Sequence, residues 1–551
     1  MLRPRLFLCL GLALAALTCA SQRPDRPPTR VVAPRGPAQW DHGWVDGAVF
    51  YEVFVRSFAD SDGDGKGDLE GLISKLDYLN DGNPATDRDL QVDALWLMPV
   101  FQSPSYHGYD TVDYERIDDE YGSNATFERF LAEAHRRGIE VIVDFVVNHT
   151  SASHPWFLDS ASGPSSSRRE WYVWSPTNPG WTQPWGPGPT WHAGGGAFYY
   201  GVFWSGMPDV NWRHPPMRAE MHRLAKLWLD RGVDGFRLDA TRHLVETGPG
   251  AGQSDTAETH AVLKELSAFV RSVQPDAILV GENWTDTPTI ATYYGDARSV
   301  PGGDELPMNF DFPLAEAVVS GVRAGQGAGI AAKLAEIGAL YPSGALDAPF
   351  LTNHDQVRVA TQLGGETSKL RNAAAILLTL PGTPFLYYGE EIGLQNGTTS
   401  NDEAKRTPMP WDATAGGGFT AGTPWFPFAP GKETANVAAQ TENAGSLLSR
   451  YRTLIRARRA SPALSRGATR MLSPAGGSPA ILAFTRTEGA ETVFVAHNLG
   501  DAIATAGPYD LPGGSSETVF ADPGASLTGS TSAWRVTLPP RASGVFWVRS
   551  P

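Results

Sequence analysis

Short apolar runs that alternate with amphipathic helical segments constrain the fold of this 551-residue chain most strongly. This alternation is typical of parallel α/β architecture, in which a covering helix follows each strand. Eight strands are predicted, at residues 48–54, 94–99, 139–145, 233–238, 278–280, 307–312, 348–351 and 384–388. Eight such units favour a (β/α)8 TIM barrel, whose active site lies at the carboxyl ends of the strands.

Two segments interrupt this rhythm and divide the chain. Residues 150–212 are rich in Trp, Gly, Pro and Ser and lack a helical period. Because a structureless loop of that length is uncommon in a compact domain, we expect an inserted domain between the barrel parts 41–149 and 213–462. Residues 463–551 change to alternating, β-rich segments with Gly and Pro turns. They are expected to form an antiparallel β-sandwich.

The first 40 residues predict export. Arg3 and Arg5 precede an apolar run over residues 6–18, which is too short to span a bilayer as a helix. We therefore expect a signal peptide at 1–19 and a Pro-rich tether at 20–40. The segment ending in Cys19 resembles a lipoprotein cleavage box, although Thr18 departs from it. The protein is thus expected to be periplasmic, attached to a membrane through lipidated Cys19, or extracellular after removal of a plain signal peptide.

The charge and cysteine content limit the partners and the chemistry. The chain has 45 Lys and Arg against 60 Asp and Glu, a net charge of −15. This balance argues against nucleic acid, because phosphates require a basic face. The two cysteines, Cys9 and Cys19, lie in the predicted signal, so an internal disulfide is not expected after its removal.

Four predicted strands end in a carboxylate. Asp144, Asp239, Glu282 and Asp355 follow the third, fourth, fifth and seventh strands. A single acidic residue after a strand is more often a helix cap or a turn former than a catalyst. Four of them at corresponding ends of barrel strands converge on one pocket. They therefore indicate a site for acid–base chemistry.

The segments around these carboxylates resemble four signature regions of the α-amylase family of glycoside hydrolases (family thirteen). They read Asp-Phe-Val-Val-Asn-His from Asp144, Gly-Phe-Arg-Leu-Asp-Ala around Asp239, Val-Gly-Glu-Asn-Trp around Glu282 and Thr-Asn-His-Asp up to Asp355. Met207-Pro-Asp-Val-Asn211 resembles the fifth region. The order of barrel, inserted domain B, barrel and β-domain C is also similar to that of the family.

The resemblance implies a retaining double displacement, in which one carboxylate attacks the anomeric carbon and a carboxylic acid protonates the leaving oxygen. Asp239 matches the nucleophile, Glu282 the acid/base and Asp355 the third carboxylate. Arg237, on the same strand face as Asp239, is expected to keep that carboxylate ionised. Glu282 must be protonated, so we expect the negative charges of Asp239 and Asp355 to raise its pKa.

Further residues match substrate contacts of the family. Tyr109 matches the aromatic platform under the sugar ring, and Arg242 with His243 stands where endo-acting amylases place Lys-His for the leaving-group sugars. Arg for Lys keeps the charge but changes the geometry of that contact. The implied substrate-binding residues are His107, Tyr109, His149, Arg237, Arg242, His243 and His354.

The segment from Asp60 to Asp68 places carboxylates at alternating positions with glycines between them. It resembles the first part of a calcium loop, although the closing glutamate of an EF-hand is replaced by Gly71. An acidic solvated turn is the alternative, but four carboxylates so close together repel one another without a cation. A structural Ca²⁺ is expected, with Asp60, Asp62, Asp64, the Lys66 carbonyl and Asp68 as ligands. Asn148 matches a residue that binds a different calcium in other branches.

The exact reaction stays partly open. Ala240 after the expected nucleophile resembles α-1,4-acting members, and Met207 to Asn211 resembles the branch intermediate between oligo-1,6-glucosidases and neopullulanases. Arg406-Thr-Pro-Met-Pro-Trp411 resembles α-glucosidases and trehalose synthases. We expect a monomeric, endo-acting α-1,4-glucan hydrolase working on starch or maltooligosaccharides. The alternatives are an exo-acting α-glucosidase or oligo-1,6-glucosidase, a trehalose-synthase-like transglycosylase, and a non-catalytic glucan-binding protein. The last of these predicts loss of at least one catalytic carboxylate.

Overall fold

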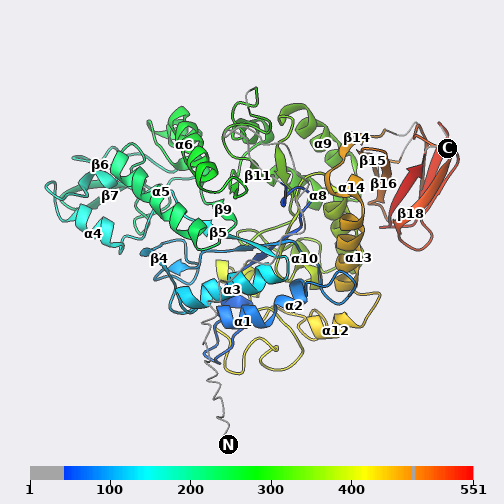
Figure 1. Cartoon of the computed structure of the whole chain (residues 1–551), viewed down its shortest axis with the longest axis horizontal. Coiled ribbons are helices and arrows are strands. Elements are labelled where there is room, and N and C mark those ends of the chain that lie inside the picture. Colours follow the sequence, from blue (N-terminus) through cyan, green and yellow to red (C-terminus); the bar gives the residue numbers. More distant parts are fainter. Residues whose placement is uncertain (1–42, 299, 474–477, 531, 550–551) are drawn as a thin grey trace, which may run out of the picture. The chain divides into compact units, whose positions relative to one another are not determined.

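Eight parallel strands form the central sheet of the computed structural model, which describes residues 43–298, 300–473, 478–530 and 532–549 (Figure 1). The strands are β1 (Phe50–Val53), β2 (Ala94–Leu97), β5 (Glu140–Phe145), β9 (Gly235–Leu238), β10 (Ile278–Gly281), β11 (Met308–Phe310), β12 (Leu346–Ala348) and β13 (Phe385–Tyr387). Their order is β12-β11-β10-β9-β5-β2-β1-β13. A parallel bridge between Phe350 and Phe385 joins the two edges of this sheet. The expected (β/α)8 barrel is therefore confirmed.

Apolar side chains fill the inside of the barrel. Trp96, Phe310 and Phe385 form a cluster there, with ring centroids 5.2 Å apart for Trp96 and Phe310 and 4.8 Å apart for Phe310 and Phe385. Other residues of the strands face the surrounding helices and are buried as well. Burial on both faces explains why these strands are continuous apolar runs in the sequence.

The seventh predicted strand is displaced. Residues 348–351 were expected, whereas β12 spans Leu346–Ala348. Pro349 has no N–H group to donate to the ladder, so the regular strand ends before it. The other seven predicted strands overlap the observed ones, with ends that differ by up to two residues.

Helices follow the strands along the chain. They are α1 (Leu69–Ser74), α2 (Leu76–Leu79), α3 (Asn124–Arg136), α5 (Pro215–Asp230), α6 (Ala257–Val273), α7 (Thr287–Thr292), α8 (Phe312–Ala324), α9 (Ala328–Leu340), α10 (Val359–Gln362), α11 (Thr367–Thr379), α12 (Val437–Thr441), α13 (Leu447–Ala460) and α14 (Pro462–Arg466). In α3, the Ser123 side chain caps the first turn by accepting from the Thr126 N–H group. Phe127, Phe130 and Leu131 form its buried face, as the spacing predicts.

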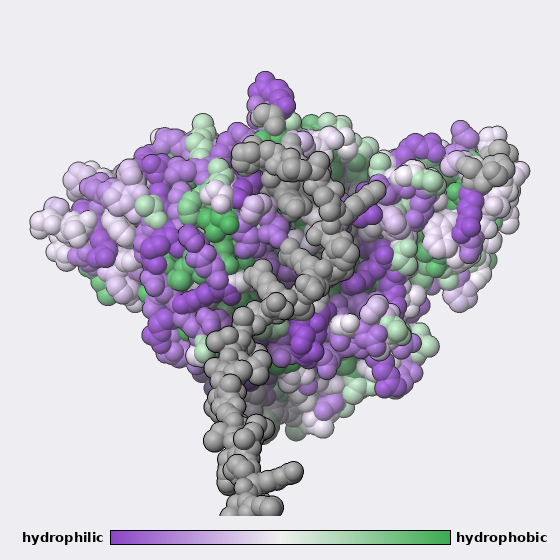
Figure 2. Space-filling view, in the orientation of Figure 1, coloured by the Kyte–Doolittle hydropathy of each residue, from purple (hydrophilic) through white to green (hydrophobic). Residues whose placement is uncertain are grey.

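Residues 150–212 contain a short helix and a small sheet. The helix is α4 (Pro155–Ala161), and the antiparallel sheet has the order β6 (Trp174–Ser175), β8 (Ala197–Tyr200), β7 (Trp191–Gly194). Figure 1 shows these elements together at one end of the molecule, next to α5. On the face in Figure 2, this inserted segment is mostly white to purple. Another short antiparallel pair, β3 (Phe101–Gln102) and β4 (Asp113–Ile117), precedes α3.

The C-terminal strands form two antiparallel sheets, as expected. The five-stranded sheet contains β14 (Ala468–Met471), β15 (Ile481–Glu488), β16 (Glu491–Asn498), β21 (Ser543–Arg549) and β18 (Ser515–Ala521). The other contains β17 (Ala504–Tyr509), β20 (Trp534–Leu538) and β19 (Ser526–Thr528). Phe494 and Phe546 of the first sheet share a buried cluster with Trp534 of the second.

The predicted signal peptide, the tether and Cys19 lie outside the described residues. Within the described part of the chain, no helix combines the length and the apolar character that a membrane span requires.

Candidate active site

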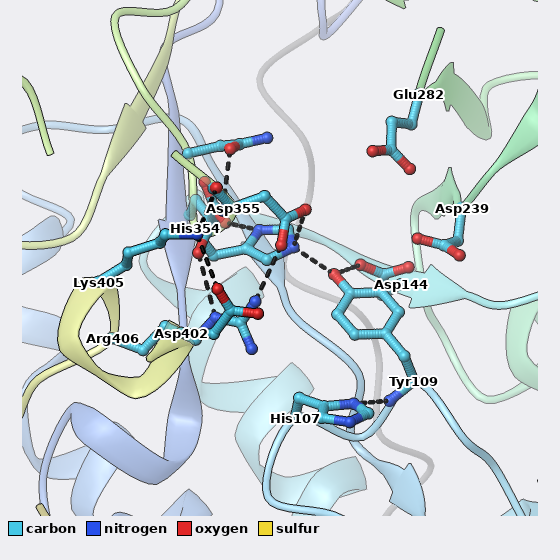
Figure 3. Close-up of polar contacts among 12 residues, drawn as sticks. His107, Tyr109, Asp144, Asp239, Glu282, His354, Asp355, Asp402, Lys405 and Arg406 are labelled. Atoms are coloured by element: carbon cyan, nitrogen blue, oxygen red, sulfur yellow. Dashed lines mark hydrogen bonds and ion pairs between the residues drawn. The ribbon is translucent and has the colours of Figure 1, made fainter. Parts of the chain in front are cut away.

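The strand-end carboxylates lie close together in space. Asp144 is near the end of β5, Asp239 and Glu282 directly follow β9 and β10, and Asp355 follows β12. In Figure 3 the carboxylates of Asp239, Glu282 and Asp355 face toward one another, with Tyr109 and Asp144 beside them. The barrel thus brings together residues that are far apart in the sequence.

Arg237 connects three of these carboxylates. Its side chain is fully buried, and its Nη1 atom lies 3.0 Å from Asp144 Oδ1 and 2.5 Å from Asp239 Oδ1. Its Nη2 atom lies 2.9 Å from Glu282 Oε2. One guanidinium therefore places its positive charge among three carboxylates and fixes their spacing.

Burial is the main cause that raises the pKa of Glu282. Asp239 and Asp355 add to this rise, while Arg237 and a hydrogen bond from the Ala240 N–H group oppose it. That bond is 3.0 Å long and is donated to Glu282 Oε2. The expected direction of the shift is present, but the sequence argument named only the neighbouring charges. A raised pKa suits a carboxyl group that donates a proton.

Ala240, directly after Asp239, adopts a left-handed backbone conformation with φ of 50°. This region is unfavourable for a residue with a Cβ atom, and such strain often occurs at functional sites. In this conformation, the Ala240 N–H group donates to Glu282. The strained residue therefore links the two carboxylates that follow β9 and β10.

His354 lies between two acidic residues. Its Nδ1 atom is 2.6 Å from Glu52 Oε1, and its Nε2 atom is 3.0 Å from Asp355 Oδ2. Although burial opposes the charged form, Asp355 and Glu52 raise the pKa of His354 to about 9. The residue is therefore a buried imidazolium at neutral pH.

Arg406 holds the other oxygen of Asp355. Its Nη2 atom donates to Asp355 Oδ1 at 2.9 Å, and its Nη1 atom donates to the Tyr106 hydroxyl at 3.0 Å. Burial opposes ionisation of Asp355, but His354 and Arg406 lower its pKa well below the ordinary value. Asp355 is thus a fixed negative charge across the site from Glu282.

Sequence reasoning assigned no role to Glu52 or Arg406. Glu52 lies within β1 and is buried, and an acidic residue inside an apolar strand is the signal that could have identified it. Arg406 belongs to the Arg406–Trp411 segment, but its contact with Asp355 depends on the tertiary fold.

Tyr109 and His107 lie in the site. The Tyr109 hydroxyl donates to Asp144 Oδ2 at 2.9 Å and lies 2.7 Å from His354 Nε2. The ring is nearly parallel to the His354 ring, with centroids 5.5 Å apart. His107 Nδ1 accepts the Tyr109 N–H at 3.1 Å, which fixes the turn that carries both residues.

His149 is one of the expected substrate contacts. It is buried, and burial lowers its pKa to about 4, so the ring is neutral at neutral pH. Among the described residues, its Nε2 atom has no hydrogen-bond partner. Its ring centroid lies 5.2 Å from that of Phe203 in the inserted segment. The free nitrogen is available to a hydroxyl group of a ligand.

Arg242 and His243 are held by protein contacts. Arg242 binds the Asp255 carboxylate through Nε at 2.9 Å and Nη2 at 2.6 Å, and its Nη1 atom donates to the Trp284 carbonyl at 2.7 Å. His243 Nδ1 lies 2.9 Å from the Gln253 carbonyl oxygen. The guanidinium of Arg242 thus fixes the loop that carries Trp284.

Three of the four acidic residues in the predicted calcium loop form a group. Oxygen atoms of Asp60, Asp62 and Asp68 lie within 4.8 Å of one another, whereas Asp64 is outside this group. Because Ca²⁺ binds oxygen at about 2.3–2.6 Å, one ion could contact all three. The Lys66 side chain is paired with Glu120. The donor set therefore fits a hard cation, with Asp64 less well placed than expected.

The same loop packs against residues 419–425. The Asp60 N–H group donates to the Phe419 carbonyl at 2.8 Å, and the Trp425 N–H group donates to the Gly65 carbonyl at 2.8 Å. Gly65 has a φ of +93°, and a Cβ atom there would lie 1.9 Å from the Thr423 carbonyl oxygen. Only glycine allows this close approach.

At the second calcium position considered, Asn148 lies beside Asp209. Asn148 Oδ1 and Asp209 Oδ2 are buried and lack hydrogen-bond partners in the described structure. Burial raises the pKa of Asp209 well above its ordinary value. The two unpartnered oxygens are compatible with a cation, which would supply the missing interaction.

Comparisons with known proteins agree with this geometry. The family model "Alpha amylase, catalytic domain" matches residues 52–467. Alpha-amylase 3 of Dictyoglomus thermophilum is 40% identical over 465 residues, which cover 84% of this chain and 86% of that protein. Trehalose synthase of a Pimelobacter species is 35% identical over 497 residues, covering 80% of this chain and 84% of that protein.

Among solved structures, the α-amylase from H. orenii is similar with a TM-score of 0.81 and 38% sequence identity. The match covers 92% of this chain and 100% of that one. The barrel, the clustered carboxylates and these matches lead to one conclusion: the chain belongs to the α-amylase family of glycoside hydrolases and is a glycosidase.

Proposed function

We propose that this glycosidase is an endo-acting, retaining hydrolase of α-1,4-glucosidic bonds in starch and maltooligosaccharides. The observation that carries the proposal is the placement of Asp239 and Glu282. Strands β9 and β10 pair in register, with Leu238 opposite Gly281, so the next residues in each strand direction are neighbours. Arg237 contacts both carboxylates, with Nη1 2.5 Å from Asp239 Oδ1 and Nη2 2.9 Å from Glu282 Oε2, so the two groups flank one small space, as a retaining mechanism requires.

In the proposed first step, an oxygen of Asp239 attacks the anomeric carbon while Glu282 gives its proton to the glycosidic oxygen. The bond from the anomeric carbon to that oxygen breaks, and the leaving sugar departs with a free hydroxyl. In the second step, the ionised Glu282 takes a proton from water. The water oxygen attacks the same carbon and releases Asp239. Arg237 supports this alternation because it contacts both carboxylates.

We assign sugar binding to the groups opposite Glu282. Asp355 is held ionised by His354 and Arg406, so it can accept hydrogen bonds from sugar hydroxyl groups. The neutral His149 offers its free Nε2 atom. His354 contacts Asp355, and the Tyr109 hydroxyl lies beside His354 Nε2. Figure 3 shows His107 next to Tyr109. A fixed anion near the reacting carbon also favours a positively charged oxocarbenium-like transition state.

The preference for endo attack on α-1,4 bonds is supported by Ala240 and by the similarity to an α-amylase at 40% identity. The similarity to a trehalose synthase, together with the Arg406–Trp411 segment, favours the alternative of exo-acting or transglycosylating activity. Products from amylose, pullulan, isomaltose, maltose and trehalose, separated by chromatography, distinguish the two. A spread of maltooligosaccharides from amylose is expected. Glucose alone, or interconversion of maltose and trehalose, would contradict the proposal.

We also propose that the loop from Asp60 to Asp68 binds a structural Ca²⁺ through Asp60, Asp62 and Asp68, with Asp64 and the Lys66 carbonyl as further ligands. The grouped oxygens support this assignment. A bound cation would offset the repulsion between the carboxylates and fix the loop against residues 419–425.

A further inference from the structure

Glu52 is a carboxylate on the inner face of the barrel strand β1. Phe50, two residues earlier and therefore on the same face, packs in the apolar barrel interior with Trp96 and Phe385. The strand register places Glu52 beside Trp96 of β2. Glu52 is 2% exposed. A charged group in such surroundings requires a partner that offsets its loss of hydration.

That partner is His354, which contacts two carboxylates through opposite sides of its ring. His354 Nδ1 lies 2.6 Å from Glu52 Oε1, and Nε2 lies 3.0 Å from Asp355 Oδ2. A neutral imidazole carries one N–H group, whereas an imidazolium carries two. Only the charged ring can therefore donate a hydrogen bond to Glu52 and to Asp355 at the same time.

Packing fixes the position of the His354 ring. The ring is fully buried and lies edge-on against Trp96, with centroids 5.6 Å apart, and nearly parallel to Tyr109. Arg406 Nε donates to the His354 carbonyl oxygen at 3.1 Å. Figure 3 shows His354 linked to both Asp355 and Tyr109. Because the ring is held on all these sides, its protonation is the property that a neighbour can still set.

The charges around the ring favour its protonated form. The charged and titratable groups that face His354 or Glu52 are Tyr109, Asp144, Arg237, Asp355, Tyr387, Glu390 and Arg406. Burial lowers the pKa of His354, but Asp355 and Glu52 raise it to about 9. Burial raises the pKa of Glu52, while His354 and Arg237 oppose this rise. Asp355 faces the sugar site, whereas Glu52 is buried behind the ring and acts only through it.

We propose that Glu52 is a positioning residue for catalysis: it keeps both nitrogens of His354 protonated, so that the Nε2–H group holds Asp355 in the orientation that contacts the sugar. The inference rests on the proposed function, in which Asp355 binds sugar hydroxyl groups and stabilises a positively charged transition state. A neutral ring would leave one of the two carboxylates without its donor. Because the orientation of Asp355 matters most in the transition state, loss of Glu52 should slow the chemical step more than it weakens binding.

The Glu52→Gln variant removes the negative charge but keeps an oxygen that can accept the Nδ1–H group. An adjacent opposite charge changes a pKa by about 1–3, so the His354 ring should titrate at about pH 6–8 in this variant. The substrate is α-maltotriosyl fluoride, whose leaving group needs no proton from Glu282. The rate constant of fluoride release in a single turnover should differ less than about two-fold from that of the unsubstituted enzyme at about pH 5.5. It should be about ten-fold lower at about pH 8, with half-saturation changed less than two-fold.

Glu391→Gln is the matched control. Glu391 is another fully buried glutamate, but its Oε1 atom accepts from the Tyr51 hydroxyl at 2.8 Å and the Tyr78 hydroxyl at 2.6 Å. Any loss of activity in this variant should be the same at both pH values. An equal loss at both pH values for Glu52→Gln, or no loss at either, would overturn the inference.

Nuclear magnetic resonance of protein labelled with ¹⁵N-histidine separates this inference from the proposed function, because it needs no turnover. The His354 signals are identified by their absence from the His354→Gln variant. Two protonated ring nitrogens at about pH 8 in the unsubstituted protein, and only one in Glu52→Gln, would support the inference even if no fluoride is released. A neutral ring in the unsubstituted protein at this pH, or the same protonation in both proteins, would reject it.

Discussion

Replacement of Glu282 by glutamine tests the assignment of the proton donor. Glutamine has nearly the same shape and keeps one oxygen that can accept the Ala240 N–H group, which now donates to Glu282 at 3.0 Å. Arg237 retains its contacts with Asp144 and Asp239, so no buried charge loses all its partners. We therefore expect the variant to fold and to bind maltooligosaccharides. The change removes the transferable proton and little else.

Loss of a general acid costs roughly 10²- to 10⁴-fold in rate, which corresponds to about 3–5 kcal/mol of transition-state stabilisation. We expect this loss in kcat on amylose for Glu282→Gln, with a melting temperature close to that of the unsubstituted enzyme. A substrate whose leaving group needs no proton, α-maltotriosyl fluoride, should release fluoride in the first step with a much smaller loss. Undiminished turnover of amylose, or an equal loss of fluoride release, would refute the assignment.

Three further predictions concern charge, metal and positioning. The folded-state pKa of His354 is about 9, which is above its ordinary value. Its contacts with Glu52 and Asp355 therefore stabilise the fold fully below about pH 6.5, and this stabilisation is lost as the pH rises through about 9. Melting temperatures measured across this range should fall, and the fall should be smaller in Glu52→Gln; parallel curves would contradict this reasoning. Chelation should lower the melting temperature through loss of bound Ca²⁺, and Asp60→Asn should abolish the effect; an unchanged melting curve with no calcium in elemental analysis would reject the loop assignment. Arg242→Lys should lower kcat/KM on maltoheptaose by about three-fold, because lysine cannot make the two-pronged contact with Asp255. The effect on 4-nitrophenyl α-maltotrioside should be smaller. Equal effects on the two substrates would contradict the positioning role of Arg242.

The barrel was predictable from the sequence because its strands are buried on both faces. Continuous apolar runs indicate such strands. Carboxylates directly after these runs lie at the carboxyl ends of the strands, where a barrel has its active site. Asp239 and Glu282 could be singled out in this way because each follows its strand immediately. The end of β12 was missed, since Phe350 and Leu351 continue the apolar run beyond Pro349 although the ladder stops there.

Contacts between distant segments were harder to predict. Glu52 contacts His354, which is 302 residues away in the sequence. No local sequence pattern shows which histidine a buried glutamate will contact. The role of Arg242 illustrates the same limit. Its place beside His243 indicates a substrate contact, but Asp255 and the Trp284 carbonyl engage its guanidinium. The strength of burial at Glu282 also depends on packing that strand patterns do not reveal.

The central claim is that Asp239 attacks the anomeric carbon, while Glu282 donates a proton to the leaving oxygen and then takes one from water. Trapping of the covalent intermediate tests this claim most directly. In the Glu282→Gln variant, α-maltotriosyl fluoride should form the covalent maltotriosyl-enzyme intermediate. Because this variant lacks the base that activates water, hydrolysis of the intermediate should be slow. Mass spectrometry of the digested protein should find one maltotriosyl unit on the peptide that contains Asp239, at that residue. Attachment to another residue, or fluoride release with inverted product and no attached sugar, would contradict the account.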